Sequence, residues 1–420
     1  MATLPDLTQK YVALASIPLL LLATACSRNL GKSPTPNLAE SSEIASPTDG
    51  QDVEPEPTKS LKKVASYKQA IDPAMGGYYD VVFSPDGRYV ASRSFDEAIV
   101  WDIQKDIAAL RVDLTAYGTN RIIFLPDSAR IAIATGKTVS VINLQTGTET
   151  ASFTLDKEVS QIDFSADGQK ILAYAPTLEP NEGFIAVWDS QSGGKTTQIP
   201  YDQASSAAIS PDGESIVTGG LDRTIRTWNS QTGQELTQIN FNDGDSGNIP
   251  DRVGFVSDSS HIWALIDLHI LRSWDIDSQE EILKVDDTGL LPEISDNGQL
   301  AAMIHVTSEN SRTGEIGLWN TASGKELARL ADEDCRFSNY FAFSTNNRYL
   351  ATLCFKQAAR ERAPLTIFDL QTRTKISTPI VPTGNLSGFY LSADGQQIAI
   401  RSKSQDKATT TVDIWTTPTK

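Results

Sequence analysis

The stretch ISPDGESIVTGGLDRTIRTWN, at residues 209–229, is one of eight copies of a single pattern that fills the chain between residues 83 and 415. Each copy opens on a turn of the Ser-Pro-Asp-Gly kind, continues through short apolar stretches and ends on an aromatic or large apolar residue. The other copies span 83–102, 124–143, 164–189, 255–275, 294–320, 343–369 and 391–415. Repetition of β-like segments with a period of about 45 residues is typical of radially repeated folds.

Within a copy, the residue types predict short antiparallel strands that are joined by tight turns. Pro fixes φ, Asp bonds the neighbouring backbone and Gly adopts positive φ, so Pro-Asp-Gly favours a turn. In the first copy the flanking strands are expected at Val81–Phe83 and Tyr89–Ala91. We expect a large side chain at the end of each copy to fill the wedge between neighbouring sheets. These closing residues are Trp101, Ile142, Trp188, Trp228, Trp274, Trp319, Phe368 and Trp415.

The pattern resembles the WD-repeat family of β-propellers over most of residues 61–416. Literal Trp-Asp pairs stand at residues 101–102, 188–189 and 274–275, and Asp96 and Asp222 match the tight-turn Asp of the family. The Gly-His pair that precedes each blade in the family is missing, because His261, His269 and His305 all lie elsewhere. The resemblance implies an all-β propeller with one four-stranded blade per copy, and we expect its packing to rely mainly on the aromatic residues.

The ends of the chain predict how the ring closes. The last copy stops at Trp415, so the eighth blade lacks its outer strand, while a strand-like run precedes the first copy. We predict that Leu61–Tyr67 supplies the missing strand, because closure removes exposed sheet edges. The sequence therefore favours an eight-bladed propeller closed by an N-terminal strand, with a seven-bladed ring and one aberrant copy as the alternative.

Residues 1–60 have a different character from the repeats. An apolar run of 14 residues, Tyr11–Thr24, follows Lys10 and ends in Ala-Thr-Ala-Cys at 23–26, which resembles the lipobox of bacterial lipoproteins. The resemblance implies a signal peptide at 1–25 and acylation of Cys26, for example with palmitate; an ordinary signal peptide or an uncleaved anchor is the alternative. Residues 26–60 begin with this Cys and continue as an acidic, Pro- and Ser-rich linker, ahead of a propeller at 61–420. Ser27 favours the outer membrane in a double-membraned bacterium.

Charge and cysteine content narrow the class of protein further. A net charge of −17 argues against nonspecific nucleic-acid binding, which needs many basic side chains. Cys335 and Cys354 flank a predicted turn, and folding the chain there brings position 335 opposite 356. In an exported protein these two cysteines could form a disulfide, and two separate buried thiols are the alternative.

The sequence offers no catalytic constellation. No Gly-x-Ser-x-Gly elbow is present, and three scattered histidines with two cysteines do not make a zinc site. We therefore expect no catalytic residue, no metal and no cofactor. The turns after the closing aromatics also lack the Trp that quinone-dependent propeller dehydrogenases place after each turn Gly.

Four copies carry about six extra residues between their second and third strands, at 175–183, 306–315, 356–364 and 402–411. In WD-repeat propellers this connection opens on the face that usually meets partners. Two of the loops are basic in an acidic protein and are candidate partner-binding surfaces; a mobile, solvated surface is the alternative, and it is favoured as the explanation of the charge. The basic candidates are Lys356, Arg360, Arg362, Arg401, Lys403 and Lys407.

Together these observations predict a non-catalytic, monomeric propeller that is lipid-anchored in the bacterial cell envelope. We expect it to face the periplasm or the cell exterior and to act as a scaffold for protein partners. A ligand-binding or enzymatic propeller that uses its central channel is the first alternative, and a sensor of peptides or glycans is the second.

Overall fold

The computed structural model of the 420-residue chain divides into two units, Met1–Lys59 and Ser60–Lys420. The structure describes 62–70, 81–94, 96–114, 121–175, 183–201, 203–240, 249–285, 292–305, 315–331, 335–356, 365–376, 386–403 and 409–416, all in the second unit. Every regular element in these ranges is a β-strand, and none of the described residues forms a helix suited to crossing a membrane.

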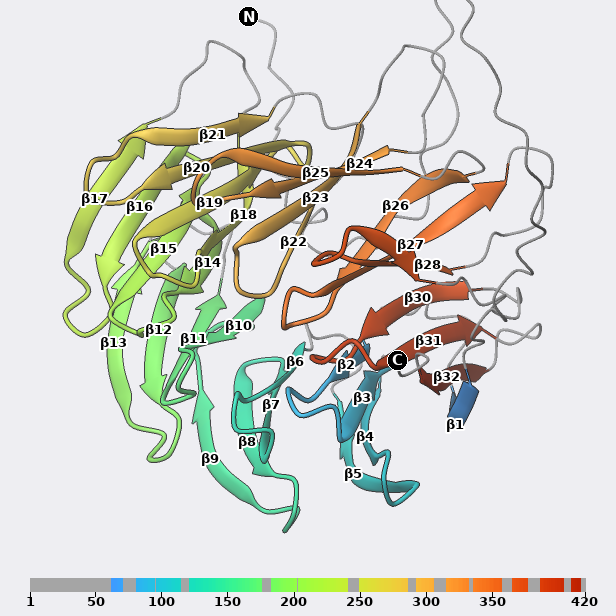
Figure 1. The fold of residues 1–420 in the computed structure, drawn as a ribbon. Coiled ribbons are helices and arrows are strands. Elements are labelled where there is room, and N and C mark those ends of the chain that lie inside the picture. Colours follow the sequence, from blue (N-terminus) through green and yellow to red (C-terminus); the bar gives the residue numbers. More distant parts are fainter. Residues whose placement is uncertain are drawn as a thin grey trace, which may run out of the picture. The chain divides into compact units, whose positions relative to one another are not determined.

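The strands form eight four-stranded antiparallel sheets, which we call blades 1 to 8 in chain order (Figure 1). Blade 1 contains β2 (Val81–Phe83), β3 (Tyr89–Arg93), β4 (Glu97–Asp102) and β5 (Ile107–Asp113). Blade 2 contains β6 (Arg121–Phe124), β7 (Arg130–Thr135), β8 (Thr138–Asn143) and β9 (Glu149–Thr154). Blade 3 contains β10 (Gln161–Phe164), β11 (Lys170–Ala175), β12 (Phe184–Asp189) and β13 (Lys195–Pro200). Blade 4 contains β14 (Ala204–Ile209), β15 (Ser215–Gly220), β16 (Thr224–Asn229) and β17 (Glu235–Asn240).

The second half of the chain repeats this arrangement. Blade 5 contains β18 (Pro250–Phe255), β19 (His261–Ile266), β20 (Ile270–Asp275) and β21 (Glu281–Val285). Blade 6 contains β22 (Glu293–Ile294), β23 (Leu300–His305), β24 (Glu315–Asn320) and β25 (Lys325–Ala331). Blade 7 contains β26 (Cys335–Phe343), β27 (Tyr349–Lys356), β28 (Leu365–Asp369) and β29 (Thr374–Ile376). Blade 8 contains β30 (Leu386–Leu391), β31 (Gln397–Lys403), β32 (Thr409–Thr416) and β1 (Lys62–Ala70).

Blade 8 confirms the predicted closure, because its outer strand comes from the other end of the chain. β1 pairs antiparallel with β32 from Lys62 opposite Thr416 to Ala70 opposite Thr409. The Lys63 ammonium lies 2.7 Å from the Asp413 carboxylate, and the Ser66 hydroxyl donates to the same carboxylate at 2.6 Å. The fold is therefore an eight-bladed β-propeller, and the seven-bladed alternative is wrong.

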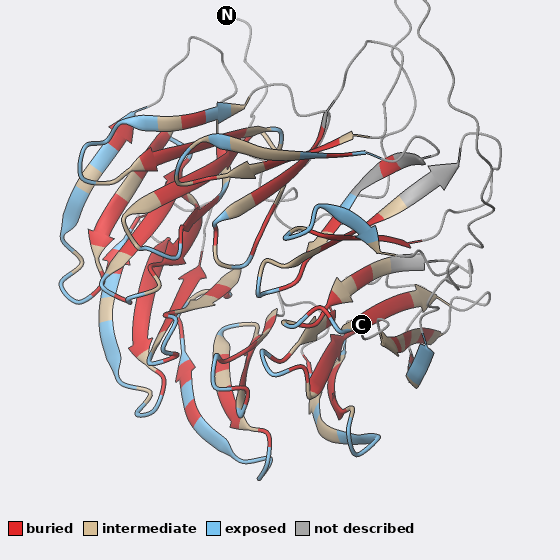
Figure 2. Ribbon diagram, in the orientation of Figure 1, coloured by how far each residue is buried: buried red, intermediate tan, exposed pale blue. Residues whose placement is uncertain are grey.

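The hydrophobic core lies between blades. Its buried residues form eight clusters, and each cluster joins one blade to the next around the ring, including blade 8 to blade 1. Second and third strands such as β11 are buried on both faces, whereas outer strands such as β13 are largely exposed (Figure 2). This burial on both faces explains why the sequence alternates poorly between apolar and polar residues.

The closing aromatics occupy the wedges as predicted. Trp101 stacks on Tyr67 of blade 8 with ring centroids 4.9 Å apart, and Trp188 stacks on Phe153 of blade 2 at 4.6 Å. Phe368 meets Phe337 edge-on at 5.8 Å within the cluster between blades 6 and 7. Such ring pairs add to the area that they bury, so each wedge is stabilised by its own closing residue.

Consecutive antiparallel strands place their connections alternately on two faces of the ring. One face carries the turns between the first and second strands and those between the third and fourth strands. We call it the turn face. In six blades a buried Ser begins the first of these turns and donates its hydroxyl to the Asp or Asn two residues on, as Ser84 does to Asp86 at 2.6 Å. The same hydroxyl accepts a backbone N–H five residues on, at Tyr89 in blade 1.

Neighbouring turns on this face are also bonded to one another. The Asp86 amide donates to Ser128 of blade 2, the Asp212 amide donates to Ser259 of blade 5, and Thr345 donates to Asp296 of blade 6. Ser128 and Ser259 have φ of 57° and 59°, at turn positions where five other blades have Gly and blade 7 has Asn347. Their hydroxyls therefore provide an inter-blade bond that Gly could not supply.

Candidate functional site

Blade 4 contains a partly buried hydrogen-bond network at the place where the sequence lacks the expected histidine. The Trp228 indole N–H donates to the Thr218 hydroxyl at 3.0 Å, and the Thr224 hydroxyl donates to Asp222 at 2.7 Å. The Tyr201 hydroxyl donates to the same Asp222 carboxylate at 3.2 Å, and its ring packs against Trp228. Tyr201 therefore gives Asp222 a partner, and burial raises the pKa of Tyr201 to about 12.

Ionisable side chains on the innermost strands are candidates for a site in the channel. Asp163 lies on β10, Asp251 and Arg252 lie on β18, and Glu293 lies on β22. Burial raises the pKa of both aspartates to about 6 and also raises the pKa of Glu293. These residues belong to three different blades, and no group of His, Cys, Asp or Glu suited to a metal ion occurs within the described ranges.

Asp163 and Asp251 bind backbone rather than one another. The Asp163 carboxylate accepts the amide of Phe164 at 2.8 Å and the amide of Ile209 in blade 4 at 3.0 Å. Asp251 accepts the amide of Leu268 at 2.7 Å. These bonds join strands and blades, so both carboxylates have a structural use that requires no ligand.

The raised pKa of Asp163 predicts a measurable pH dependence. The folded-state pKa of about 6 lies above the ordinary pKa of 3.8, so the ionised carboxylate destabilises the folded protein at neutral pH. This destabilisation disappears as the pH falls below both pKa values, because the carboxyl is then protonated in the folded and the unfolded state. The unfolding free energy of Asp163→Asn minus that of the native protein should be about 2 kcal/mol larger near pH 7.5 than near pH 4. Urea denaturation at the two pH values measures this difference, and parallel pH profiles would contradict the assignment.

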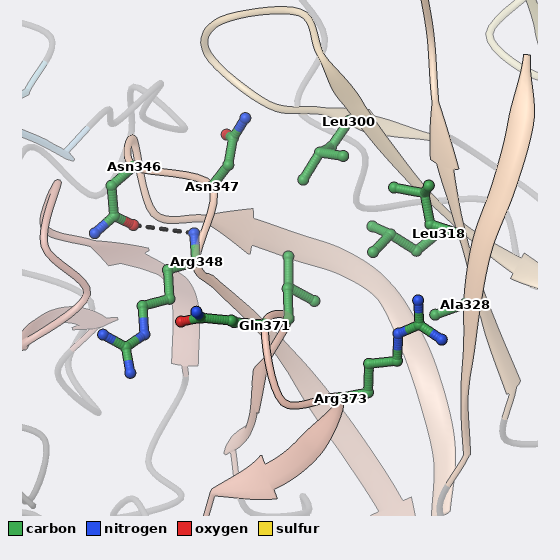
Figure 3. A pocket seen from close by; sticks show the side chains of 10 residues that line it. Leu300, Leu318, Ala328, Asn346, Asn347, Arg348, Gln371 and Arg373 are labelled. Carbon is green, nitrogen blue, oxygen red and sulfur yellow. Dashed lines mark hydrogen bonds between the residues drawn. The ribbon is translucent and has the colours of Figure 1, made fainter. Parts of the chain in front are cut away.

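A groove lies between blades 6 and 7 on the turn face. One wall consists of partly exposed apolar side chains of blade 6, among them Leu300 and Leu327, and the other carries Arg348, Gln371 and Arg373 of blade 7 (Figure 3). The groove is open to solvent and has a volume of about 450 Å³. The Arg348 guanidinium bonds the buried Asp369 carboxylate at 3.2 Å and thereby fixes one side of the groove.

The basic candidates from the sequence do not form one described surface. Arg401 is 9% exposed and lies within β31, so it is part of the sheet and not of an exposed loop. Lys356 ends β27, and Lys403 ends β31 with partial exposure. Arg360, Arg362 and Lys407 lie outside the described residues, as do most of the residues of the four long loops.

The cysteine predictions stay open. β26 and β27 pair so that Cys335 is opposite Lys356, as expected, and Cys354 is opposite Phe337. The two cysteines are therefore offset by two residues across the ladder, and their side chains lie outside the described set. Cys26 and the whole lipobox lie outside the described residues as well. The disulfide and the acylation both stay predictions.

One repeat of the chain is similar in sequence to a known family, and most of the chain is similar in fold to a solved propeller. A family model described as "WD domain, G-beta repeat" matches residues 197–229, which contain the network of Thr218, Asp222 and Trp228. The C-terminal WD40 domain of Sif2 is 12% identical, with 86% of this chain and 99% of that chain covered and a TM-score of 0.62. The β-propeller domain of Cps50 (Swd1) from Myceliophteria thermophila is 13% identical, with 72% and 97% covered and a TM-score of 0.48. No curated protein sequence matches the chain.

Proposed function

We propose that this eight-bladed propeller, one repeat of which matches the WD-domain model, is a non-catalytic scaffold for protein partners, held at a bacterial membrane by an acylated Cys26. Propellers of this type typically serve as platforms for protein interactions, and function resides in the surfaces that they present. The observation that carries the proposal is the closed ring, in which eight clusters fix each blade against its neighbours and β1 seals the last blade.

A closed ring suits a scaffold for a physical reason. Binding costs free energy to order the interacting surfaces, and a surface that is already rigid avoids much of that cost. The bonded turns of the turn face and the double-sided burial of the middle strands hold the blades in fixed register. Loops that project from such a frame can vary in length and charge without disturbing the core.

The membrane part of the proposal rests on sequence. Ala-Thr-Ala-Cys at 23–26 supports cleavage before Cys26 and acylation of its thiol, and Ser27 supports the outer membrane in a double-membraned cell. The acidic linker that follows would then let the propeller reach partners on the order of 30 Å from the anchor. Mass spectrometry of the mature N-terminus tests acylation directly, and a Cys26→Ala variant should leave the membrane fraction.

Partner contact is proposed to involve the basic loops of blades 7 and 8. The native full-length protein and a variant with Lys356, Arg360, Arg362, Lys403 and Lys407 changed to Ser would be crosslinked in cells and purified. We expect the native protein to capture discrete partners reproducibly and the variant to lose at least one of them. Equal capture by both proteins would remove the basic loops from the proposal, and an absence of any crosslinked partner would overturn the scaffold function itself.

A further inference from the structure

Blades 2 to 4 show one way in which the space between neighbouring blades is closed on the turn face. The first residue of the second strand in blade 2 is Arg130, and its guanidinium donates to Ser190 of blade 3 at 3.3 Å. The corresponding residue of blade 3, Lys170, donates to Ser230 of blade 4 at 3.2 Å and to the Gly213 carbonyl at 2.7 Å. A long cation thus reaches a buried serine on the next blade and fills the gap.

Blades 6 and 7 replace this cation and serine with two leucines. Leu300 begins β23, as Lys170 begins β11, and Leu370 follows β28 at the position of Ser190 and Ser230. Both serines are fully buried, whereas both leucines are partly exposed and line the groove described above. Between blades 6 and 7, Leu300 and Leu370 thus form no such bridge, and the space that the cation and serine fill in blades 2 to 4 is an open hollow lined by leucines.

Arg373 adds a cation to this hollow at a position that favours glycine. The turn between third and fourth strands has a left-handed residue at Gly147, Gly193, Gly233 and Gly324 in four blades, with φ between 65° and 71°. Blade 7 has Arg373 there, with φ of 59°, so an exposed arginine occupies a conformation that L side chains adopt at a cost. Within the part of the chain that the structure describes, the Arg373 guanidinium makes no ion pair.

The groove differs in charge from the chain as a whole. The chain carries 53 acidic and 36 basic side chains, yet none of the described residues that line the groove is acidic. A leucine-lined wall beside an unpaired guanidinium is complementary to an aliphatic side chain that stands next to a carboxylate. The amides of Asn346 and Gln371 lie at the groove and provide further polar groups for an extended backbone.

We propose that the groove between blades 6 and 7 binds an extended acidic segment of a partner protein, with an aliphatic side chain against Leu300, Leu327 and Leu370 and a carboxylate on Arg373. This inference rests on the proposed scaffold function and specifies one partner class for it. It places a contact on the turn face, whereas β27 and β31 end at Lys356 and Lys403 on the opposite face.

The test uses the full-length protein and short fluorescein-labelled peptides with a central Leu-Asp pair in a Gly-Ser background. Matched peptides carry Leu-Lys or Ser-Asp instead. Fluorescence polarisation should show binding of the Leu-Asp peptide, and binding about tenfold weaker for each matched peptide. The double variant Leu300→Lys, Leu370→Ser rebuilds the bridge seen between blades 3 and 4, so it should keep the melting temperature and lose the peptide.

Arg373→Gly is a second variant, and it should change stability and peptide binding in opposite directions, which loss of a purely structural residue would not do. Replacing a left-handed arginine by glycine should raise the melting temperature while weakening Leu-Asp binding about tenfold. Gln279→Gly is the matched control, because Gln279 has φ of 59° at the same turn position of blade 5, away from the groove. That variant should show the stability gain with unchanged binding.

Three outcomes would overturn the groove assignment: no binding of the Leu-Asp peptide, equal binding of all three peptides, or equal binding by the native protein and the double variant. Stronger peptide binding by a chain that lacks residues 1–60 would show that the chain's own acidic linker is the occupant, which also contradicts a partner segment. The scaffold function is judged separately, because crosslinked partners captured equally by the native protein and the double variant would leave that function intact.

Discussion

A chain that lacks residues 1–70 is expected to be recovered as aggregated or unfolded protein, whereas a chain that lacks residues 1–60 should melt at the same temperature as the full-length protein. The two truncations differ by ten residues that include all of β1. Without β1, the Trp101 ring loses its stacking partner Tyr67, and the Ser92 hydroxyl loses Gln69, to which it donates at 2.6 Å. Burial of Tyr67 alone is worth about 2 kcal/mol, and the loss of a whole strand exceeds this several-fold.

The bare edge of β32 would add an aggregation hazard to this loss of stability. In the intact blade the outer strand β1 presents Lys62, Lys63 and Lys68 to solvent, a composition that protects an edge against further pairing. Circular dichroism and size-exclusion chromatography of the two truncations measure the effect. A soluble, cooperatively melting chain without residues 1–70 would show that β1 is dispensable and that the ring closes in another way.

Trp188→Ala is expected to lower the free energy of unfolding by about 3–5 kcal/mol. Trp188 is 4% exposed, stacks on Phe153 and belongs to the cluster that joins blades 2 and 3. Removing the indole leaves a cavity in a wedge whose neighbours are strands of two sheets, and such strands cannot collapse without breaking their hydrogen bonds. Guanidinium denaturation measures the loss.

Two further variants make the Trp188 experiment specific. Trp188→Phe keeps a ring against Phe153 and should recover more than half of the loss. Trp319→Ala removes the equivalent residue of blade 6, which is only partly buried, and should cost less than Trp188→Ala. If both variants lost the same free energy of unfolding, burial of the ring between the blades would not be what determines how much each tryptophan stabilises the fold.

The fold was predictable because its determinants are local. Turn residues such as Asp86 and closing residues such as Trp188 recur in register, and the unpaired last copy identified the strand that β1 supplies. Each of these signals acts within one blade or at the chain ends, where sequence spacing reports spatial neighbours directly.

Contacts between blades were not predictable in the same way. Nothing in the sequence around Tyr201 shows that its hydroxyl meets Asp222, because the partner is reached only after two sheets pack. Arg401 was expected in a basic loop, but β31 extends through Lys403 and buries its guanidinium. The groove is lined by Leu300 and Leu370. Only the structure shows that these two residues occupy the positions of Lys170 and Ser230, which are bonded to one another between blades 3 and 4.

The closure by β1 also determines the order in which the protein can fold. β1 is synthesised first and β32 last, so the hydroxyl of Ser66 must find a carboxylate 347 residues away. Contacts of such long range form slowly, and a growing chain keeps an open ring with unpaired edges until β32 has been made. Until β1 has paired, blade 8 has an open edge that the β1 strand of a second copy could also complete, so exchange of this strand competes with closure within one chain.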